Sequence, residues 1–221
     1  IGPVSISMGQ LLAVSLIIFL TFINTLGVKS GAGIQKVFTG AKLLALFGLI
    51  ILGLYIGLQT DVFGINFTDG WDATRTTANP DGTYSVTSIT GIVFLSVFAM
   101  TMINSLFSSD AWNNVTFIAG EIKDPQKNIP RSLLLGTTIV TVLYILANLA
   151  YLALLPLKGD PNGGDVLSRG MQFAESGRVG TAAATMIFGN VATIMMALLI
   201  MVSTFGCNNG IILAGARLYY A

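Results

Sequence analysis

A polar cluster stands in the middle of an otherwise apolar run, and its residue types are those of a ligand site. Between residues 83 and 120 the only charged residue is Asp110, and its neighbours are Ser108, Ser109 and the small Ala111. A carboxylate at the centre of a hydrophobic helix is costly and normally serves a function. A helix that opens there exposes N–H and carbonyl groups that can bind a charged small molecule. The cluster therefore predicts a broken helix and a ligand site, with a buried partner for a cation on another helix as the structural alternative.

The other candidate residues each have a structural alternative. Phe107 and Trp112 flank the cluster, but a single aromatic is more typical of packing than of gating. Lys42 is the only charged residue between positions 37 and 60 and is shallow enough for its ammonium to reach the membrane interface. Ser203 and Thr204 are adjacent hydroxyls that, taken alone, are expected to bond to the preceding helical turn.

The composition excludes several classes of enzyme and binding protein. The 221 residues include no histidine, so neither a Ser-His-Asp triad nor a histidine metal site can form within the chain. The single cysteine, Cys207, cannot form an internal disulfide or a multi-cysteine zinc site. A net charge of +1 provides no basic surface for nucleic acid. We therefore expect no metal, no cofactor and no nucleic-acid partner.

The elements that must position these residues are membrane-spanning helices. Only 10% of the residues are charged, against about 25% in a typical soluble domain. No Asp, Glu, Lys or Arg occurs in residues 1–28, 132–157 or 179–216, and about 20 apolar residues suffice to cross a bilayer as a helix. The lipid bilayer is therefore an expected partner of the chain.

The apolar runs predict an all-α integral membrane protein with a single transmembrane domain over residues 1–221. The expected spans are 8–27, 37–58, 89–120, 132–156 and 189–216, with the third broken at about 107–111. Residues 179–216 are too long for one crossing, so we expect a break at residues 188–190 after a surface helix. Turn-forming residues in the segment 59–88 favour an exposed loop.

The charges of the connections predict the orientation of the spans. If the five spans alternate, the short Lys/Arg-rich connections lie on one side, which the positive-inside tendency makes cytoplasmic. The residues on that side are Lys29, Lys36, Lys123, Lys127, Arg131 and Arg217, against Arg75, Lys158, Arg169 and Arg178 on the other. A glycosylation sequon, Asn66-Phe67-Thr68, lies on the outer side, but the motif alone carries little information.

Three longer stretches resemble amino-acid transporters of the APC superfamily, in particular the L-type (LAT) branch and its bacterial relatives. Residues 24–46, NTLGVKSGAGIQKVFTGAKLLAL, resemble the junction of that family's fourth and fifth helices. Residues 107–133, FSSDAWNNVTFIAGEIKDPQKNIPRSL, resemble its broken sixth helix, and residues 203–220, STFGCNNGIILAGARLYY, resemble its eighth. The resemblance implies a fold of two inverted five-helix repeats, of which this chain holds the fourth to eighth helices. The missing N- and C-terminal helices of the same chain would then be its partners.

The resemblance also implies a substrate site at the helix break. Phe107 matches the aromatic residue that closes over bound substrate in the family. Ser108, Ser109, Asp110 and Ala111 match the unwound segment whose backbone holds the amino group of an amino acid. Many L-type members have glycines where this chain has Asp110 and Ala111, so their substrate preference does not transfer to it.

The resemblance assigns a second role, in coupling, to Lys42, Ser203 and Thr204. Lys42 matches the fifth-helix lysine that occupies a sodium site of sodium-coupled relatives. Ser203 and Thr204 match the eighth-helix hydroxyls that border this site, and we expect them to accept hydrogen bonds from the Lys42 ammonium.

The expected function is secondary active transport of amino acids across the plasma (inner) membrane by alternating access. Transport is expected to be sodium-independent, with exchange or proton-linked uptake both open. The alternative within the superfamily is a transporter of polyamines or other small organic cations. A channel is less expected because one clustered break suits an occluded site better than a lined pore. A membrane-embedded enzyme would lack an acid/base pair.

Overall fold

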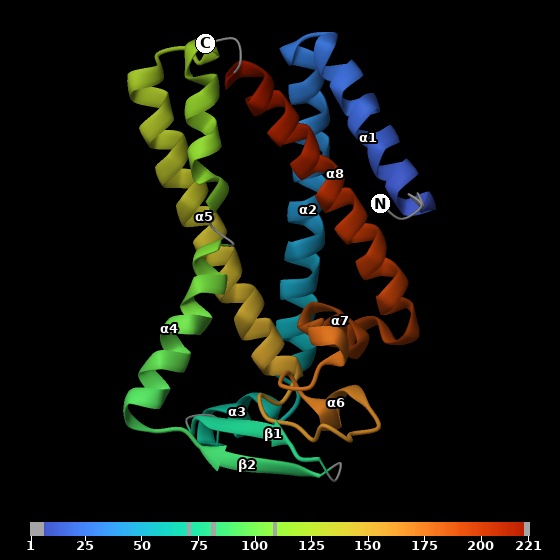
Figure 1. Cartoon of the computed structure of the whole chain (residues 1–221), viewed down its shortest axis with the longest axis vertical. Helices are drawn as coiled ribbons and strands as arrows, with labels where there is room; N and C mark the ends of the chain where they lie inside the picture. Colours follow the sequence, from blue (N-terminus) through green and yellow to red (C-terminus); the bar gives the residue numbers. More distant parts are fainter. Residues whose placement is uncertain (1–6, 70–71, 81–82, 108–109, 219–221) are drawn as a thin grey trace, which may run out of the picture. The chain divides into compact units, whose positions relative to one another are not determined.

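The computed structural model describes residues 7–69, 72–80, 83–107 and 110–218, and the described chain is mostly helical (Figure 1). The elements in chain order are α1 (Met8–Thr25), α2 (Val28–Gly57), α3 (Val62–Asp69), β1 (Thr74–Ala78), β2 (Tyr84–Ser88), α4 (Gly91–Phe107), η1 (Asp110–Glu121), α5 (Pro125–Leu154), α6 (Val166–Arg169), η2 (Glu175–Gly177), α7 (Val179–Phe188), η3 (Gly189–Val191) and α8 (Ala192–Leu218). The η elements are 3₁₀ helices.

The helices have the length and composition of membrane spans. Four described stretches are long and apolar enough to cross a bilayer, namely Met8–Thr25, Gly31–Gly57, Pro125–Leu154 and Val179–Ala216. A shorter apolar helix covers Gly91–Ile103. Many large apolar side chains on these helices are exposed, as lipid-facing side chains must be. The chain is a multi-pass, mostly α-helical membrane protein, and a small β-hairpin lies among its described residues.

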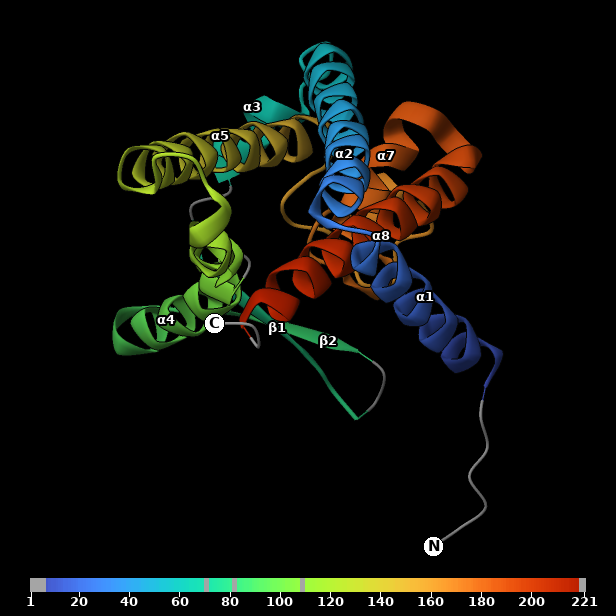
Figure 2. The same ribbon diagram turned by 90° about the horizontal axis from the view of Figure 1, so that it is seen from above.

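The two longest apolar runs are interrupted where the sequence predicts a break. The helix α4 ends at Phe107, and the described chain resumes at Asp110 as the 3₁₀ helix η1. The second interruption falls at Gly189, whose φ of 61° ends α7 before α8 begins. Figure 2 shows α7 and the start of α8 as separate helical segments joined by a tight turn.

Two predicted connections are partly helical instead. The helix α2 begins at Val28, directly after Gly27 with φ 114°, so the segment 28–36 is helix rather than loop. The helix α5 begins at Pro125, a residue that suits a first helical position, and continues through Pro130. The charge pattern marks where a helix leaves the hydrocarbon, but a 30-residue helix of about 45 Å can extend beyond it.

The segment 59–88 was predicted as an exposed loop, and this prediction is wrong in its detail. The structure places α3 and an antiparallel hairpin there, with Thr74 paired to Ser88 and Ala78 to Tyr84. The two strands are rich in Thr, Val and Tyr, which favour a pleated strand. Asn79 and Pro80 directly follow β1, and the Asn79 N–H donates to the carbonyl of Thr83 at 2.8 Å across the hairpin connection.

The chain divides into two compact units. Unit 1 comprises Ile1–Ala45, Asn113–Leu135 and Ala197–Ala221, and unit 2 comprises Leu46–Trp112 and Gly136–Met196. In unit 1 the C-terminal half of α8 crosses the first half of α2 (Figures 1 and 2), and the rings of Phe38 and Phe205 contact each other there, 4.6 Å apart between centroids and tilted by 34°.

The core of unit 2 forms where α2, α5 and α7 pack closely. Buried Leu154, Leu155, Ala182 and Ala183 make one cluster, and a second cluster contains Leu49, Ala184 and Ala192. A Cβ at Gly53 would lie 3.2 Å from that of Ala150, and one at Gly57 only 2.5 Å from that of Ala153. These two glycines therefore let the backbones of α2 and α5 approach each other.

Candidate functional site

The helix break is the first part of the candidate site. Its backbone is described as far as Phe107 and again from Asp110, whereas Ser108 and Ser109 lie outside the described residues. The side chains of Phe107, Asp110 and Ala111 are likewise not among those described. After the break, η1 runs for 12 residues in 3₁₀ form, although such helices rarely exceed four residues and a long one often marks a functional hinge.

Lys42 is the second part of the candidate site, and α8 holds its ammonium. This half-buried lysine lies on α2, and its Nζ donates a hydrogen bond to Cys207 Sγ at 3.3 Å. A Cβ at Gly206 would lie 3.2 Å from the same Nζ and 2.9 Å from Phe38 Cβ. Gly206 therefore leaves the space in which the Lys42 side chain packs against α8.

Ser203 and Thr204 lie on α8 about one turn before this contact. The Thr204 hydroxyl donates to the carbonyl of Ile200 at 2.9 Å, within its own helix. The Ser203 side chain is half-buried. The hydrogen bond that the structure gives Lys42 goes to the Cys207 thiol, in place of the hydroxyl acceptors expected from the sequence.

A group of amides that the sequence reading missed lies further along unit 1. Asn209 is completely buried, and its Nδ2 donates to the carbonyl of Gly31 at 3.0 Å and to Gln35 Oε1 at 3.2 Å. Its Oδ1 accepts from Asn24 Nδ2 at 3.0 Å. We call Asn24, Gln35 and Asn209 the amide cluster. In the sequence these residues appear only as three carboxamides within apolar helices. Asn24 and Asn209 are 185 positions apart, so no local pattern indicates that they meet.

The sequon at Asn66 is a structural element in the folded chain. Asn66 is 8% exposed, and its Nδ2 donates to the carbonyls of Leu152 and Leu155, both at 2.8 Å. Its Oδ1 accepts from the Leu157 N–H at 2.7 Å. The Asn66 amide thus closes the C-terminal end of α5, and a glycan on that nitrogen is incompatible with these contacts.

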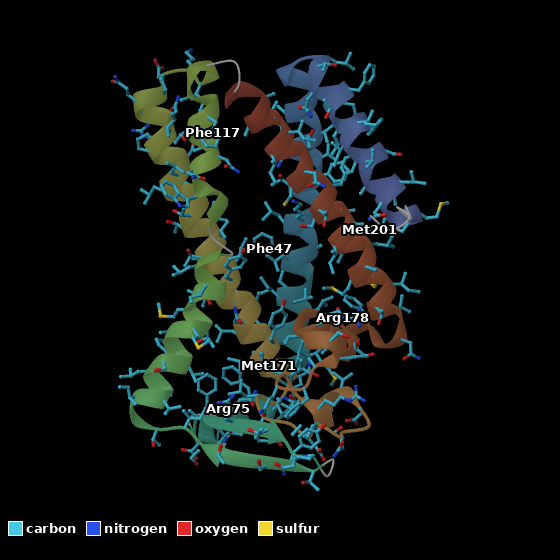
Figure 3. All side chains as sticks on the ribbon, in the orientation of Figure 1. Phe47, Arg75, Phe117, Met171, Arg178 and Met201 are labelled. Carbon is cyan, nitrogen blue, oxygen red and sulfur yellow. The ribbon has the colours of Figure 1, made fainter. Side chains whose placement is uncertain are left out.

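A cavity of about 380 Å³ with several charged residues in its lining opens in unit 2 beside α6 and α7. Its lining includes Asp165, Arg169, Glu175, Arg178 and Thr181, and Figure 3 labels Arg178 at this place. Hydrogen bonds from the side chain and backbone of Ser168 lower the pKa of the Asp165 carboxyl, which caps α6. Lys42, Ser203 and Thr204, whose side chains the structure describes, are not among the residues that line this cavity.

The long apolar helices define an integral membrane protein with several membrane-spanning helices. A family model described as "Amino acid permease" matches residues 5–221. The chain belongs to the amino acid permease family.

Several curated proteins are similar to this chain. The serine/threonine exchanger SteT of Bacillus subtilis (strain 168) is 27% identical over 97% of this chain and 41% of its own length. The large neutral amino acids transporter small subunit 2 of Oryctolagus cuniculus is 26% identical over 96% of this chain and 34% of its own length. The b(0,+)-type amino acid transporter 1 of Mus musculus is 33% identical over 66% of this chain and 26% of its own length.

The family and these relatives are transporters and not enzymes. The chain spans less than half the length of each of these relatives.

Proposed function

We propose that the whole protein carries amino acids across the plasma membrane by alternating access and that it needs no sodium ion. The observation that carries the sodium-independent part is the contact of the Lys42 ammonium with Cys207 on α8 at 3.3 Å. The relatives are a serine/threonine exchanger and two amino acid transporters, which supports amino acids as the transported substrates.

The proposed role of Lys42 follows from its charge and its place. A fixed ammonium between α2 and α8 supplies the positive charge that a bound cation would otherwise bring there. An ammonium has three N–H donors, and the one that bonds to Cys207 links α2 to α8 without an ion. A protein with this arrangement has no electrostatic reason to bind sodium at the same point.

The proposed substrate site is the break between α4 and η1. Backbone N–H and carbonyl groups released from α-helical bonding can hold the charged groups of an amino acid. Phe107, Ser108, Ser109, Asp110 and Ala111 would form this side of the site. Asp110 also favours one alternative cargo, a polyamine or another small organic cation.

Transport by the purified full-length protein in proteoliposomes tests the proposal. Counterflow of labelled amino acid should occur, and replacing sodium by choline should leave the rate unchanged. The Lys42→Ala variant should lose about tenfold or more of its rate, because a hydrogen bond to a charged group is worth roughly 1.5 kcal/mol or more. The matched control is Lys36→Ala, since Lys36 is an exposed lysine of the same helix.

Each alternative gives a different result in this assay. Strict sodium dependence of the unmodified protein would overturn the role of Lys42 while leaving amino-acid transport intact. If the protein takes up putrescine and amino acids do not inhibit this uptake, the organic-cation alternative is supported instead. Flux that shows no counterflow and no saturation would indicate a channel.

A further inference from the structure

We propose that Asn209 is a positioning residue that locks α1, α2 and α8 into one body and thereby keeps Lys42 in place against α8. The inference rests on the proposed function for its transport readout, because Lys42 is a transport residue only under that proposal. It concerns the amide cluster, to which neither the sequence nor the resemblance assigned a role.

Asn209 is the residue at which all three helices meet. It is completely buried and bonds through both ends of its carboxamide, to Asn24 on α1 and to Gly31 and Gln35 on α2. A buried amide that loses its partners keeps the full penalty of desolvation. The helices therefore separate at this point only by breaking several hydrogen bonds together.

The contacts between α2 and α8 form one continuous seam from the amide cluster to Lys42. A Cβ at Gly31 would lie 3.4 Å from Leu213 Cδ1, and one at Gly210 would lie 3.4 Å from Gln35 Nε2. Next along the seam, the tilted rings of Phe38 and Phe205 contact each other.

The seam ends at Lys42, whose side chain packs against Gly206 and Cys207. Lys42 follows Gln35 by seven positions, which is only about 10 Å along the helix, so a movement of α8 at the amide cluster also moves it at Lys42.

The hydrogen bonds of the amide cluster fix the position of α8 along and around its axis relative to α2. A carboxamide has its donor and acceptor on opposite branches, so the three bonds of Asn209 fix the rotation of α8 as well as its distance from α2. Gly31 adds a steric condition, because a Cβ there would collide with Asn24 Oδ1. A small slip of α8 would break these bonds and move Gly206 and Cys207 away from the Lys42 ammonium.

The experiment compares Asn209→Leu and Asn24→Leu with the double variant and with a control. Asn148→Leu is the control, since Asn148 is exposed on α5 and donates to the Tyr144 carbonyl of its own helix. Spin labels at Val37 and Ile211, both exposed in unit 1, report the distance between α2 and α8. Counterflow in proteoliposomes gives turnover and KM per folded transporter, and thermal unfolding gives stability.

We expect both single variants to broaden the distribution of distances between the spin labels. Turnover should fall roughly 3- to 20-fold, the range that corresponds to the free energies of intramembrane hydrogen bonds, with little change in KM. The double variant should be no worse than Asn209→Leu, because the two residues share one bond. Asn148→Leu should change neither readout.

Two results would overturn the inference. One is an unchanged label distance in Asn209→Leu. The other is a lower unfolding temperature with normal turnover per folded molecule, which would make Asn209 a residue of stability only. Failure of the unmodified protein to transport amino acids would instead reject the proposed function, and the label distances would still decide whether Asn209 locks the seam.

Discussion

Asp110 is the residue whose charge is expected to shape the choice of substrate. It is the first residue after the helix break, and under the proposed function it lies beside the place where a substrate's amino group binds. Coulomb attraction is weakly screened in an occluded site. We therefore predict that the protein accepts lysine, arginine or ornithine besides small neutral amino acids, and that Asp110→Asn selectively loses the cationic substrates.

Uptake of labelled lysine and alanine by the Asp110→Asn variant, at matched protein levels, measures this effect. The substitution removes the charge while nearly keeping the shape of the side chain. An equal loss of lysine and alanine uptake would contradict the prediction and would indicate that Asp110 pairs with a cation on another helix.

The residues of the site differ in how far the sequence could reveal them. Lys42 could be found because a charge inside an apolar run is conspicuous in any single sequence. The hydrogen-bond acceptor of the Lys42 ammonium could not be found in this way. The hydroxyls of Ser203 and Thr204 and the thiol of Cys207 lie within about one helical turn, and only the packing of α8 decides which of them meets the ammonium. The amide cluster depends wholly on tertiary contact.

At the scale of elements, the close approach of α2 and α5 depends most on Gly57. A Cβ at Gly57 would lie 2.5 Å from Ala153 Cβ and 2.7 Å from the Ala153 carbonyl carbon. We predict that Gly57→Ala destabilises the protein by about 1–3 kcal/mol, the usual cost of overpacking. Gly48→Ala is the control, because nothing lies within 4 Å of a Cβ at Gly48 on the same helix.

Thermal unfolding in detergent, followed by the loss of monodisperse protein, compares the two variants. Gly57→Ala should unfold at a lower temperature than the unmodified protein, whereas Gly48→Ala should match or exceed it, since alanine favours a helix over glycine. Equal unfolding temperatures for both variants would show that α2 and α5 can separate without cost at Gly57.

The helices could be predicted from the sequence where a long apolar run determines them. The charge-free runs located the long helices, and Gly189 with Asn190 located the break before α8. The first residues of α2 and the β-hairpin escaped prediction for different reasons. Lys29 and Lys36 are compatible with both a loop and a helix that leaves the bilayer, and Thr-rich strands of five residues give too short a pattern to stand out.

For the whole molecule, the asymmetry of Lys and Arg predicts the orientation in the membrane. Lys29 and Lys123 should face the cytoplasm, while Asp72 and Asp165 should face outside. Single cysteines at these four positions, in a full-length background in which Cys207 is replaced, can be labelled with an impermeant reagent on intact cells. Labelling is expected at 72 and 165 only, and labelling at position 29 would contradict the orientation.

The buried amide of Asn66 has a consequence for how the protein can be made. The acceptors of this amide, Leu152 and Leu155, follow it by 86 and 89 residues, so a ribosome adding about 5–20 residues per second makes them several seconds later. On the predicted orientation, the sequon faces the lumen of a eukaryotic secretory pathway during that interval. A sugar added then would occupy the nitrogen before α5 exists to receive it. The Thr68→Ala change removes the acceptor signal and keeps Asn66, so it should raise the yield of folded protein from eukaryotic cells and leave the yield from bacteria unchanged.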